Sequence, residues 1–178
     1  MATICVYCAS ATGIDARYVE LAGAVGTELA RRGHDLVTGG GTVSMMGAVA
    51  KAARAGGARS TGVIPRSLLD VEVGDQHADE LVVVETMRER KAEMERRSDG
   101  FLALPGGIGT LEELFEVWTS RTLSMHDKPV VVLDHDNFFG PLWTFVDALV
   151  EKQFVRPGAY RALIVRDSVE KALAAAAP

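Results

Sequence analysis

Two glycine-rich runs in the chain could bind an anion through backbone N–H groups. They are Gly39-Gly40-Gly41-Thr42 and Pro105-Gly106-Gly107-Ile108-Gly109-Thr110, and each stands between a short β-rich run and a helical pattern. Glycines there leave N–H groups and the positive end of the following helix open to a phosphate. Neither run continues into Gly-Lys-Ser/Thr, and the first turn of the chain lacks G-x-G-x-x-G, which removes the usual support for NTPases and NAD dehydrogenases. Two such loops favour a mononucleotide-sized ligand, whereas one alone would often be only a tight turn.

The glutamate at the end of the second run has two interpretations. The run Thr110-Leu111-Glu112-Glu113 fits a capping box, in which Thr110 and Glu113 cap the start of a helix reciprocally. Helical periodicity, however, puts Glu113 beside the glycine loop and opposite a buried stripe formed by Leu111, Leu114, Phe115 and Trp118. A carboxylate in that place repels phosphate but can hold ribose hydroxyls. The pattern leaves both the helix cap and the catalytic group open.

Two basic residues occupy unusual positions in the preceding helical pattern. Met87 and Met94 mark its apolar stripe, and Arg90 and Lys91 fall on the same stripe. Charged side chains are rarely placed there, although long basic ones can extend from such positions to solvent. The alternative is contact with an anionic ligand in a cleft.

Other kinds of chemistry find little support. The histidines His34, His77, His126 and His135 have no metal-ligand spacing, so we expect no metal site. Cys5 and Cys8 are three residues apart in a predicted strand and therefore point to opposite faces, which predicts two buried, reduced thiols. No G-x-S-x-G nucleophile motif occurs. Carboxylates and arginine remain as catalytic candidates.

The elements that must position these residues alternate between strands and helices. This order predicts an α/β fold with a doubly wound parallel sheet of six to seven strands, covered by helices on both faces, in one domain spanning residues 1–178. The predicted strands are Thr3 to Cys8, Asp35 to Thr38, Ser60 to Ile64, Leu81 to Val84, Gly100 to Leu104, Pro129 to Leu133 and Leu163 to Arg166. The predicted helices are Ala16 to Arg32, Val43 to Ala55, Met87 to Arg97, Leu111 to Met125, Phe139 to Lys152 and Ser168 to Ala176.

Ligands of such sheets bind beyond the carboxyl ends of the strands, where the strand order reverses. Both glycine runs follow strands and are expected at that edge. The long irregular segment from Pro65 to about Glu80 is acidic, and a loop of that length in a compact domain is more often functional than idle.

Composition excludes several classes of protein. The chain has 178 residues, 48% of them hydrophobic and 24% charged, with a formal net charge of -5. These values are typical of a globular domain and argue against a protein that binds nucleic acid through a lysine and arginine excess. No apolar stretch approaches the length needed to span a bilayer, and no secretory signal is evident. We therefore expect a cytoplasmic protein without nucleic-acid or membrane partners.

The run Pro105 to Glu113, preceded by Arg90-Lys91-Ala92-Glu93-Met94, resembles the Lonely Guy family of cytokinin riboside 5′-monophosphate phosphoribohydrolases. The resemblance extends from Val6-Tyr7-Cys8 through Gly39-Gly40-Gly41 and Met46-Gly47-Ala48 to His126-Asp127-Lys128-Pro129. It implies a Rossmann-like fold, a homodimer, and release of adenine-type bases from nucleoside 5′-monophosphates without a cofactor. Family members are often labelled lysine decarboxylases, but no lysine here stands out as a Schiff-base site.

The resemblance also assigns residues to roles. It implies that Arg90 and Glu113 are catalytic, and that the substrate-binding residues are Glu72, Lys91, Gly107, Ile108, Gly109, Thr110, Leu111, Glu112 and Thr119. Gly39, Gly40, Gly41 and Gly106 complete the expected phosphate loops. The chain departs from the family at Arg88, where many members have His, at Ser44, where many have Gly, and in the loop Cys8-Ala9-Ser10-Ala11, which leaves base preference and phosphate contacts open.

The expected reaction is hydrolysis of the N-glycosidic bond of cytokinin riboside and adenosine 5′-monophosphates, giving free base and ribose 5-phosphate through an oxocarbenium-like transition state. One alternative is a non-catalytic nucleotide or cofactor carrier, since fold and phosphate loops alone do not establish hydrolysis. Another is a broader hydrolase that cleaves AMP and has no special relation to cytokinins.

Overall fold

Seven parallel strands form one sheet in the order β4-β3-β2-β1-β5-β6-β7 in a computed structural model that describes residues 1–178. Each strand is a short run rich in valine, isoleucine or leucine, as expected where helices cover both faces of a sheet. The strands are β1 (Thr3–Tyr7), β2 (Asp35–Thr38), β3 (Ser60–Pro65), β4 (Glu80–Val84), β5 (Gly100–Ala103), β6 (Val130–Leu133) and β7 (Leu163–Arg166). The predicted doubly wound α/β fold is confirmed.

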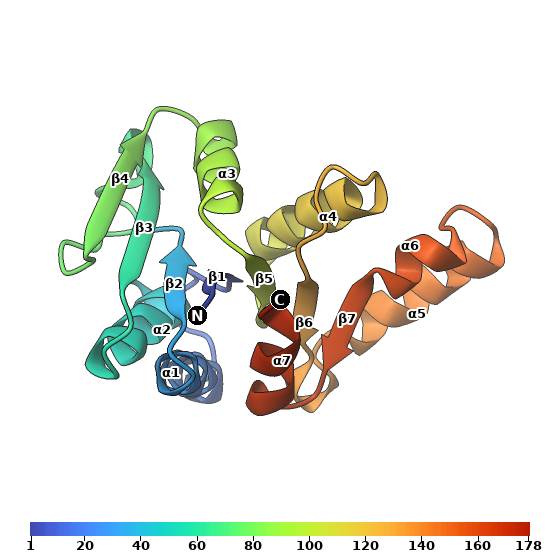
Figure 1. The fold of residues 1–178 in the computed structure, drawn as a ribbon, viewed down its shortest axis with the longest axis horizontal. Coiled ribbons are helices and arrows are strands. Elements are labelled where there is room, and N and C mark those ends of the chain that lie inside the picture. Colours follow the sequence, from blue (N-terminus) through green and yellow to red (C-terminus); the bar gives the residue numbers. More distant parts are fainter.

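Helices cover both faces of this sheet (Figure 1). One face carries α1 (Ala16–Arg31), α2 (Ser44–Ala55) and α7 (Val169–Ala176), and the other carries α3 (Met87–Arg96), α4 (Ile108–Thr122), α5 (Gly140–Glu151) and α6 (Pro157–Arg161). Two 3₁₀ turns, η1 (Arg66–Leu68) and η2 (His135–Asn137), lie in connecting segments.

A separate hydrophobic core lies on each face of the sheet, and residues of β1 alternate between the two. Ile4 and Val6 belong to the core under α1, α2 and α7, whereas Cys5 and Tyr7 belong to the core under α3, α4 and α5. Cys8 packs in the first core, so the two thiols are buried on opposite faces, as predicted, and neither forms a disulfide.

The helix boundaries depart from the expectation mainly in α4. This helix begins at Ile108, three residues before the predicted start, with Gly107 as its N-cap residue. Its first turn contains a glycine and a threonine, which are weak helix formers and hide the start in the sequence. Phe115, expected on the buried stripe, is 38% exposed. The short helix α6 was not predicted, because five residues that begin with a proline give no helical period.

The position of β1 defines where a ligand can bind. Strands β2, β3 and β4 follow on one side of β1 and β5, β6 and β7 on the other, so the strand order reverses between β1 and β5. Tyr7, the last residue of β1, lies beside Ala103, the last residue of β5. The loops that follow these strands therefore diverge and leave a cleft between them.

The acidic segment between β3 and β4 is fixed to the rest of the molecule. Asp75 is buried and accepts a hydrogen bond from Arg54 at 2.7 Å. The Asp75 N–H donates to the Gly40 carbonyl, and Gly41 and Gly74 form an isolated bridge. The segment is thus held against the loop that follows β2.

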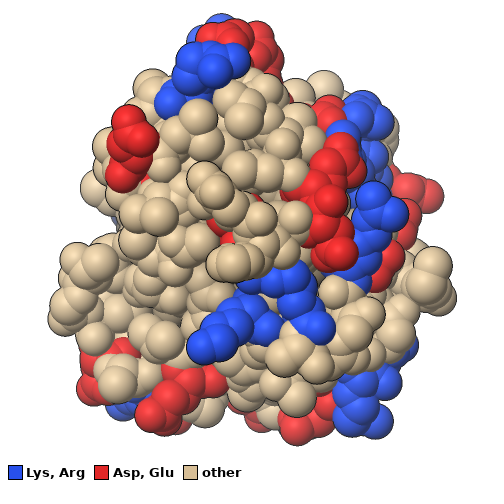
Figure 2. Space-filling view, turned by 90° about the vertical axis from the view of Figure 1, so that its left-hand side faces the viewer, with Lys and Arg blue, Asp and Glu red and all other residues tan.

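The surface agrees with the modest net charge. On the face seen in Figure 2, lysine and arginine side chains are interspersed with acidic and uncharged ones. None of the helices combines the length and the apolar composition that a membrane-spanning segment requires.

Candidate active site

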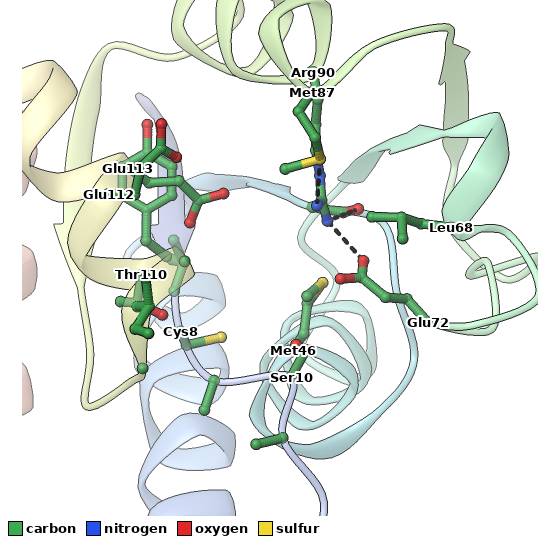
Figure 3. Close-up of a pocket in the computed structure, with 18 of the residues that line it drawn as sticks. Cys8, Ser10, Met46, Leu68, Glu72, Met87, Arg90, Thr110, Glu112 and Glu113 are labelled. Carbon is green, nitrogen blue, oxygen red and sulfur yellow. Dashed lines mark hydrogen bonds and ion pairs between the residues drawn. The ribbon is translucent and has the colours of Figure 1, made fainter.

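A cavity of about 330 Å³ opens at the carboxyl edge of the sheet, beside β1. One wall comes from Gly107 to Thr110 with Glu112 and Glu113 of α4, and the opposite wall comes from Met87, Arg90 and Met94 of α3 with Leu68 and Glu72 (Figure 3). The end of β1 and its loop, from Val6 to Ala11, form the floor together with Gly39 and Met46. The cavity thus lies at the reversal of strand order, as the glycine runs predicted.

Arg90 is buried and tied to the sheet by several hydrogen bonds. Its Nη2 donates to the Gly39 carbonyl at 2.6 Å and to Glu72 Oε2 at 2.8 Å, and its Nε donates to the Val63 carbonyl at 3.1 Å. Only 4% of the residue is exposed, so the alternative of a side chain extending to solvent is wrong. Nη1 contacts the sulfur of Met87 at 3.8 Å and is the guanidinium nitrogen without an oxygen partner. It is therefore the nitrogen that a ligand can engage.

Glu72 is held in place through its backbone. The Thr42 N–H donates to the carbonyls of Glu72 and Val73, both at 3.0 Å, and the Thr42 hydroxyl donates to the Val73 carbonyl at 2.9 Å. Val73 has a φ of 50°, which a β-branched residue rarely adopts. These contacts fix the carboxylate that pairs with Arg90.

Glu113 lines the cavity from the α4 side and accepts no hydrogen bond. Burial raises the pKa of its carboxyl to about 7, and the charge of Arg90 opposes this rise only in part. The negative charges of Glu112 and Glu72 add to it. A carboxyl with such a pKa can hold or release a proton at neutral pH, as an acid or base catalyst must.

The capping-box interpretation of Glu113 is wrong. Because α4 begins at Ile108, Thr110 is the third helical residue, and no side chain caps the helix. The Thr110 side chain packs instead against Gly106, where an added Cβ would lie 2.2 Å from Oγ1. A capping box is present at α3, where the Thr86 hydroxyl accepts from the Glu89 N–H at 3.1 Å. Sequence reasoning missed that cap, although Thr-x-x-Glu was its signal.

The start of α4 presents an open anion-binding surface to the cavity. The N–H groups of its first turn, from Ile108 to Thr110, have no acceptor within the helix. A Cβ added to Gly107 or Gly109 would meet no atom within 4 Å. Both glycines line the cavity, so a phosphate group can approach these N–H groups without obstruction.

Two glycines of the expected phosphate loop after β2, Gly40 and Gly41, do not present a free N–H group to the cavity. The Gly40 N–H donates to the Thr38 hydroxyl at 3.2 Å, and the Gly41 N–H donates to the sulfur of Met46 at 3.1 Å. Gly40 and Gly41 do not line the cavity, and the Gly39 carbonyl accepts from Arg90. The amides of Gly40 and Gly41 are thus used within the protein.

Three of the expected substrate-binding residues lie outside the cavity wall. Lys91 forms ion pairs with Glu112 and, at 2.9 Å, with Glu116. Leu111 packs against the core, and Thr119 lines a different, apolar groove on the outer side of α4. Conversely, the cavity contains Tyr7, Cys8, Met46, Leu68 and Met87, which the sequence did not single out for binding. Their signals were indirect: Leu68 lies in the long segment from Pro65 to about Glu80, Cys8 begins the loop after the first strand, and the others lie near the ends of elements. Nowhere do three or more metal-ligating side chains cluster.

Comparison with known proteins gives consistent matches. A family model described as "possible lysine decarboxylase" matches residues 46–176. A cytokinin riboside 5′-monophosphate phosphoribohydrolase of Mycobacterium tuberculosis is 51% identical over 176 residues, which cover 99% of this chain and 94% of that protein. The phosphoribohydrolase LOG7 of Arabidopsis thaliana is 45% identical over 161 residues, covering 90% and 74%.

Among solved structures, the Moco carrier protein of Chlamydomonas reinhardtii superposes with a TM-score of 0.72. The match covers 97% of this chain and 93% of that one, at 22% sequence identity. Similarity at this level shows a shared fold, and the activity must be argued from the site.

Proposed function

The chain belongs to the family described as possible lysine decarboxylases, which includes the cytokinin riboside 5′-monophosphate phosphoribohydrolases, and on this premise we propose that it is a phosphoribohydrolase. It hydrolyses the N-glycosidic bond of cytokinin riboside and adenosine 5′-monophosphates and releases free base and ribose 5-phosphate. The observation that carries the proposal is that Arg90 and Glu113 face one cavity beside an open helix N-terminus. Lysine decarboxylation through a Schiff base lacks support, since no lysine lines the cavity.

The start of α4 binds the 5′-phosphate in this proposal. The free N–H groups of residues 108–110 and the positive helix end favour an anion there, and Gly107 and Gly109 leave room for it. The phosphate does not react, but the energy of its binding then positions C1′ of the sugar, where the reaction occurs. Lys91 takes part by neutralising Glu112, at the edge of the same wall.

Glu113 and Arg90 act on the sugar and the base. Glu113 lies one helical turn beyond the phosphate site, where it can hold ribose hydroxyls and direct a water molecule at C1′ or offset the positive charge of the oxocarbenium-like transition state. Arg90, fixed by Gly39, Val63 and Glu72, orients the substrate through Nη1 and assists departure of the base. The reaction needs neither a metal ion nor an organic cofactor, and we place it in the cytoplasm.

The test is to incubate purified protein with AMP and with isopentenyladenosine monophosphate and to resolve the free bases by chromatography. We expect base release from both, and the ratio of their kcat/KM values establishes the preference. Arg90→Ala and Glu113→Ala should abolish release while the proteins stay folded. Binding without base release at catalytic protein levels would overturn the hydrolase and favour a carrier.

We further propose that the enzyme is a homodimer in which a second copy covers the outer side of α4. Phe115, Leu123 and Phe154 are exposed there and line a groove of about 400 Å³ with Thr119. Large apolar side chains gathered in this way are typical of an interface between subunits. Thr119 then reaches a ligand only across the interface, which explains its distance from the cavity of its own chain.

Light scattering should give a dimer, and Phe154→Glu should give monomers. Mixing inactive Glu113→Gln protein with inactive Thr119→Arg protein should restore activity, because some mixed dimers contain one intact site. A monomeric wild-type protein with full activity would contradict the dimer.

A further inference from the structure

The cavity holds an excess of negative charge for a site that binds a phosphate. Glu72, Glu112 and Glu113 line it, and Arg90 is the only basic residue among its lining residues. A nucleoside 5′-monophosphate brings between one and two further negative charges at neutral pH. Arg90 is already paired with Glu72 at 2.8 Å, and Lys91 pairs with Glu112. Glu113 is thus the one carboxylate of the cavity without a cationic partner.

The surroundings of Glu113 compensate its charge only in part. From β1 and the residue that follows it, Tyr7 and the thiols of Cys5 and Cys8 stay neutral, because burial raises the pKa of each well above its ordinary value. From α3, Arg90 and Lys91 approach, but both are engaged with other carboxylates. The remaining groups that act on it, Glu72 and Glu112, are negative. A proton is the cation that can neutralise Glu113 most readily.

We infer that a nucleoside 5′-monophosphate binds together with one proton, which is taken up by Glu113, and that the chemical step starts from the neutral carboxylic acid. The inference rests on the proposed function, since it assumes the phosphate at the start of α4. A phosphate there adds negative charge one helical turn from the carboxyl, and a nearby like charge favours its protonated form. Arg90 cannot serve as the acid, because a guanidinium keeps its proton in proteins.

The proton has a defined course through the reaction. As the C1′–N bond breaks, its electron pair stays with the base, and the proton of Glu113 passes to a base nitrogen. The carboxylate so formed faces the positively charged sugar. Water then adds its oxygen to C1′ and returns a proton to Glu113. The base leaves with one added hydrogen and the sugar with one hydroxyl, and Glu113 gives up its proton when ribose 5-phosphate departs.

Calorimetric titration with a carbocyclic analogue of AMP, which binds but cannot form the oxocarbenium, tests the uptake directly. Repeated at pH 7.5 in buffers of different ionisation enthalpy, it should show uptake of most of one proton. The Kd should rise by nearly tenfold per pH unit above pH 8, because proton uptake links affinity to pH. Glu113→Gln should bind with no uptake and with a Kd that stays constant over the same range. Glu116→Gln, which removes a carboxylate of the same helix outside the cavity, should behave as the wild type.

The pH dependence of kcat for AMP gives a second readout that a structural role of Glu113 would not change. The neutral acid predicts a kcat that falls at high pH. A kcat that falls instead on the acid side, through a group near pH 7, would overturn the inference. Binding of the analogue without proton uptake would also overturn it and leave the proposed function intact. Absence of both analogue binding and base release from AMP would overturn the two together.

Discussion

The two glycine loops look alike in sequence, yet they do opposite things at the same edge of the sheet. In the loop after β2, a Cβ added to Gly39 would lie 2.1 Å from Arg90 Nη2, and one added to Gly41 would lie 2.9 Å from the Glu72 carbonyl oxygen. In the loop after β5, a Cβ added to Gly107 or Gly109 would meet nothing. The first set of glycines makes room for neighbouring parts of the protein, and the second leaves open space at the start of α4.

This difference shows that a glycine, which has no Cβ, can serve a site in two separate ways. Gly39 lets a buried guanidinium approach the backbone and take the carbonyl as its acceptor. Gly107 and Gly109 leave helix N–H groups open toward the cavity. Substitutions in the two loops should therefore fail in different ways.

Among the glycine substitutions, Gly39→Ala should cause the largest loss of activity. The methyl group would displace the guanidinium of Arg90 from the Gly39 carbonyl, and a misplacement of about 1 Å in a site can reduce the rate by about 100-fold. We expect a loss of that size in kcat/KM for AMP, with a decrease of about 1–3 kcal/mol in the free energy of unfolding. Steady-state kinetics and urea unfolding measure the two. Activity within threefold of the wild type would show that Arg90 does not depend on this loop.

Glu113→Gln, on the helix that follows the second loop, should make the protein more stable at pH 8. Burial raises the pKa of Glu113 from its ordinary 4.5 to about 7. The unfolded chain therefore loses this proton at a lower pH than the folded one, and the fold loses stability as pH rises from 4.5 to 7. The glutamine should restore about 1–3 kcal/mol at pH 8 and nothing at pH 4.

Thermal unfolding at the two pH values measures this gain. Chromatography of the free base measures the expected loss of base release. A destabilised variant at pH 8 would mean that Glu113 supports the helix after all. Glu116→Gln is the matched control, and its stability should change little at either pH.

Much of the fold was predictable because burial follows a local pattern. The apolar runs placed β2 and β7 at their observed residues, and the order of elements gave the parallel sheet. The cavity at the reversal of strand order followed from topology. Arg90 could be recognised as unusual because it is a charged residue on the apolar stripe of its helix, which the local sequence pattern shows directly.

The contacts that separate the two glycine loops were not predictable. Arg90 and Gly39 are 51 positions apart, and no local pattern records that their atoms meet. For the same reason, the sequence could not place Lys91 and Thr119 outside the cavity or bring Met46 and Leu68 into it. The start of α4 was hidden because its first turn contains Gly109 and Thr110, which are weak helix formers.

Gly109→Ala should separate binding from stability in the second loop. Alanine is the better helix former, so the free energy of unfolding should rise by about 0.5–1 kcal/mol. The methyl group would enter the space open to a phosphate, and the Kd of ribose 5-phosphate should rise by about tenfold, the size of one weakened charged hydrogen bond. Calorimetry measures the Kd. Unchanged affinity would move the phosphate away from the start of α4.

Ser44→Gly should have the smallest effect, a gain of about 0.5–1 kcal/mol in unfolding free energy. Ser44 opens α2 with a φ of 53°, a region that costs a residue with a Cβ about 1 kcal/mol, and its buried hydroxyl has no partner. A glycine at this position would therefore relieve backbone strain. Ser124→Gly is the control for the effect of the backbone conformation alone, because Ser124 is exposed just beyond the C-terminal end of α4 and has a φ of 59°. A loss of stability in Ser44→Gly would show that the hydroxyl has a bonding role.

The anchoring of Arg90 on main-chain carbonyls also bears on how this site can change over evolutionary time. Val63 and Gly39 offer their carbonyl oxygens to the guanidinium, and a carbonyl persists whatever side chain its residue carries. Leu68, Met46 and Met87 line the same cavity, but their side chains have no oxygen atom that could accept a hydrogen bond from the guanidinium. Substitutions at these three positions can therefore change the shape of the cavity while the Arg90 guanidinium stays in place. One cavity thus combines a cation held by backbone atoms with lining side chains that can be exchanged independently of it.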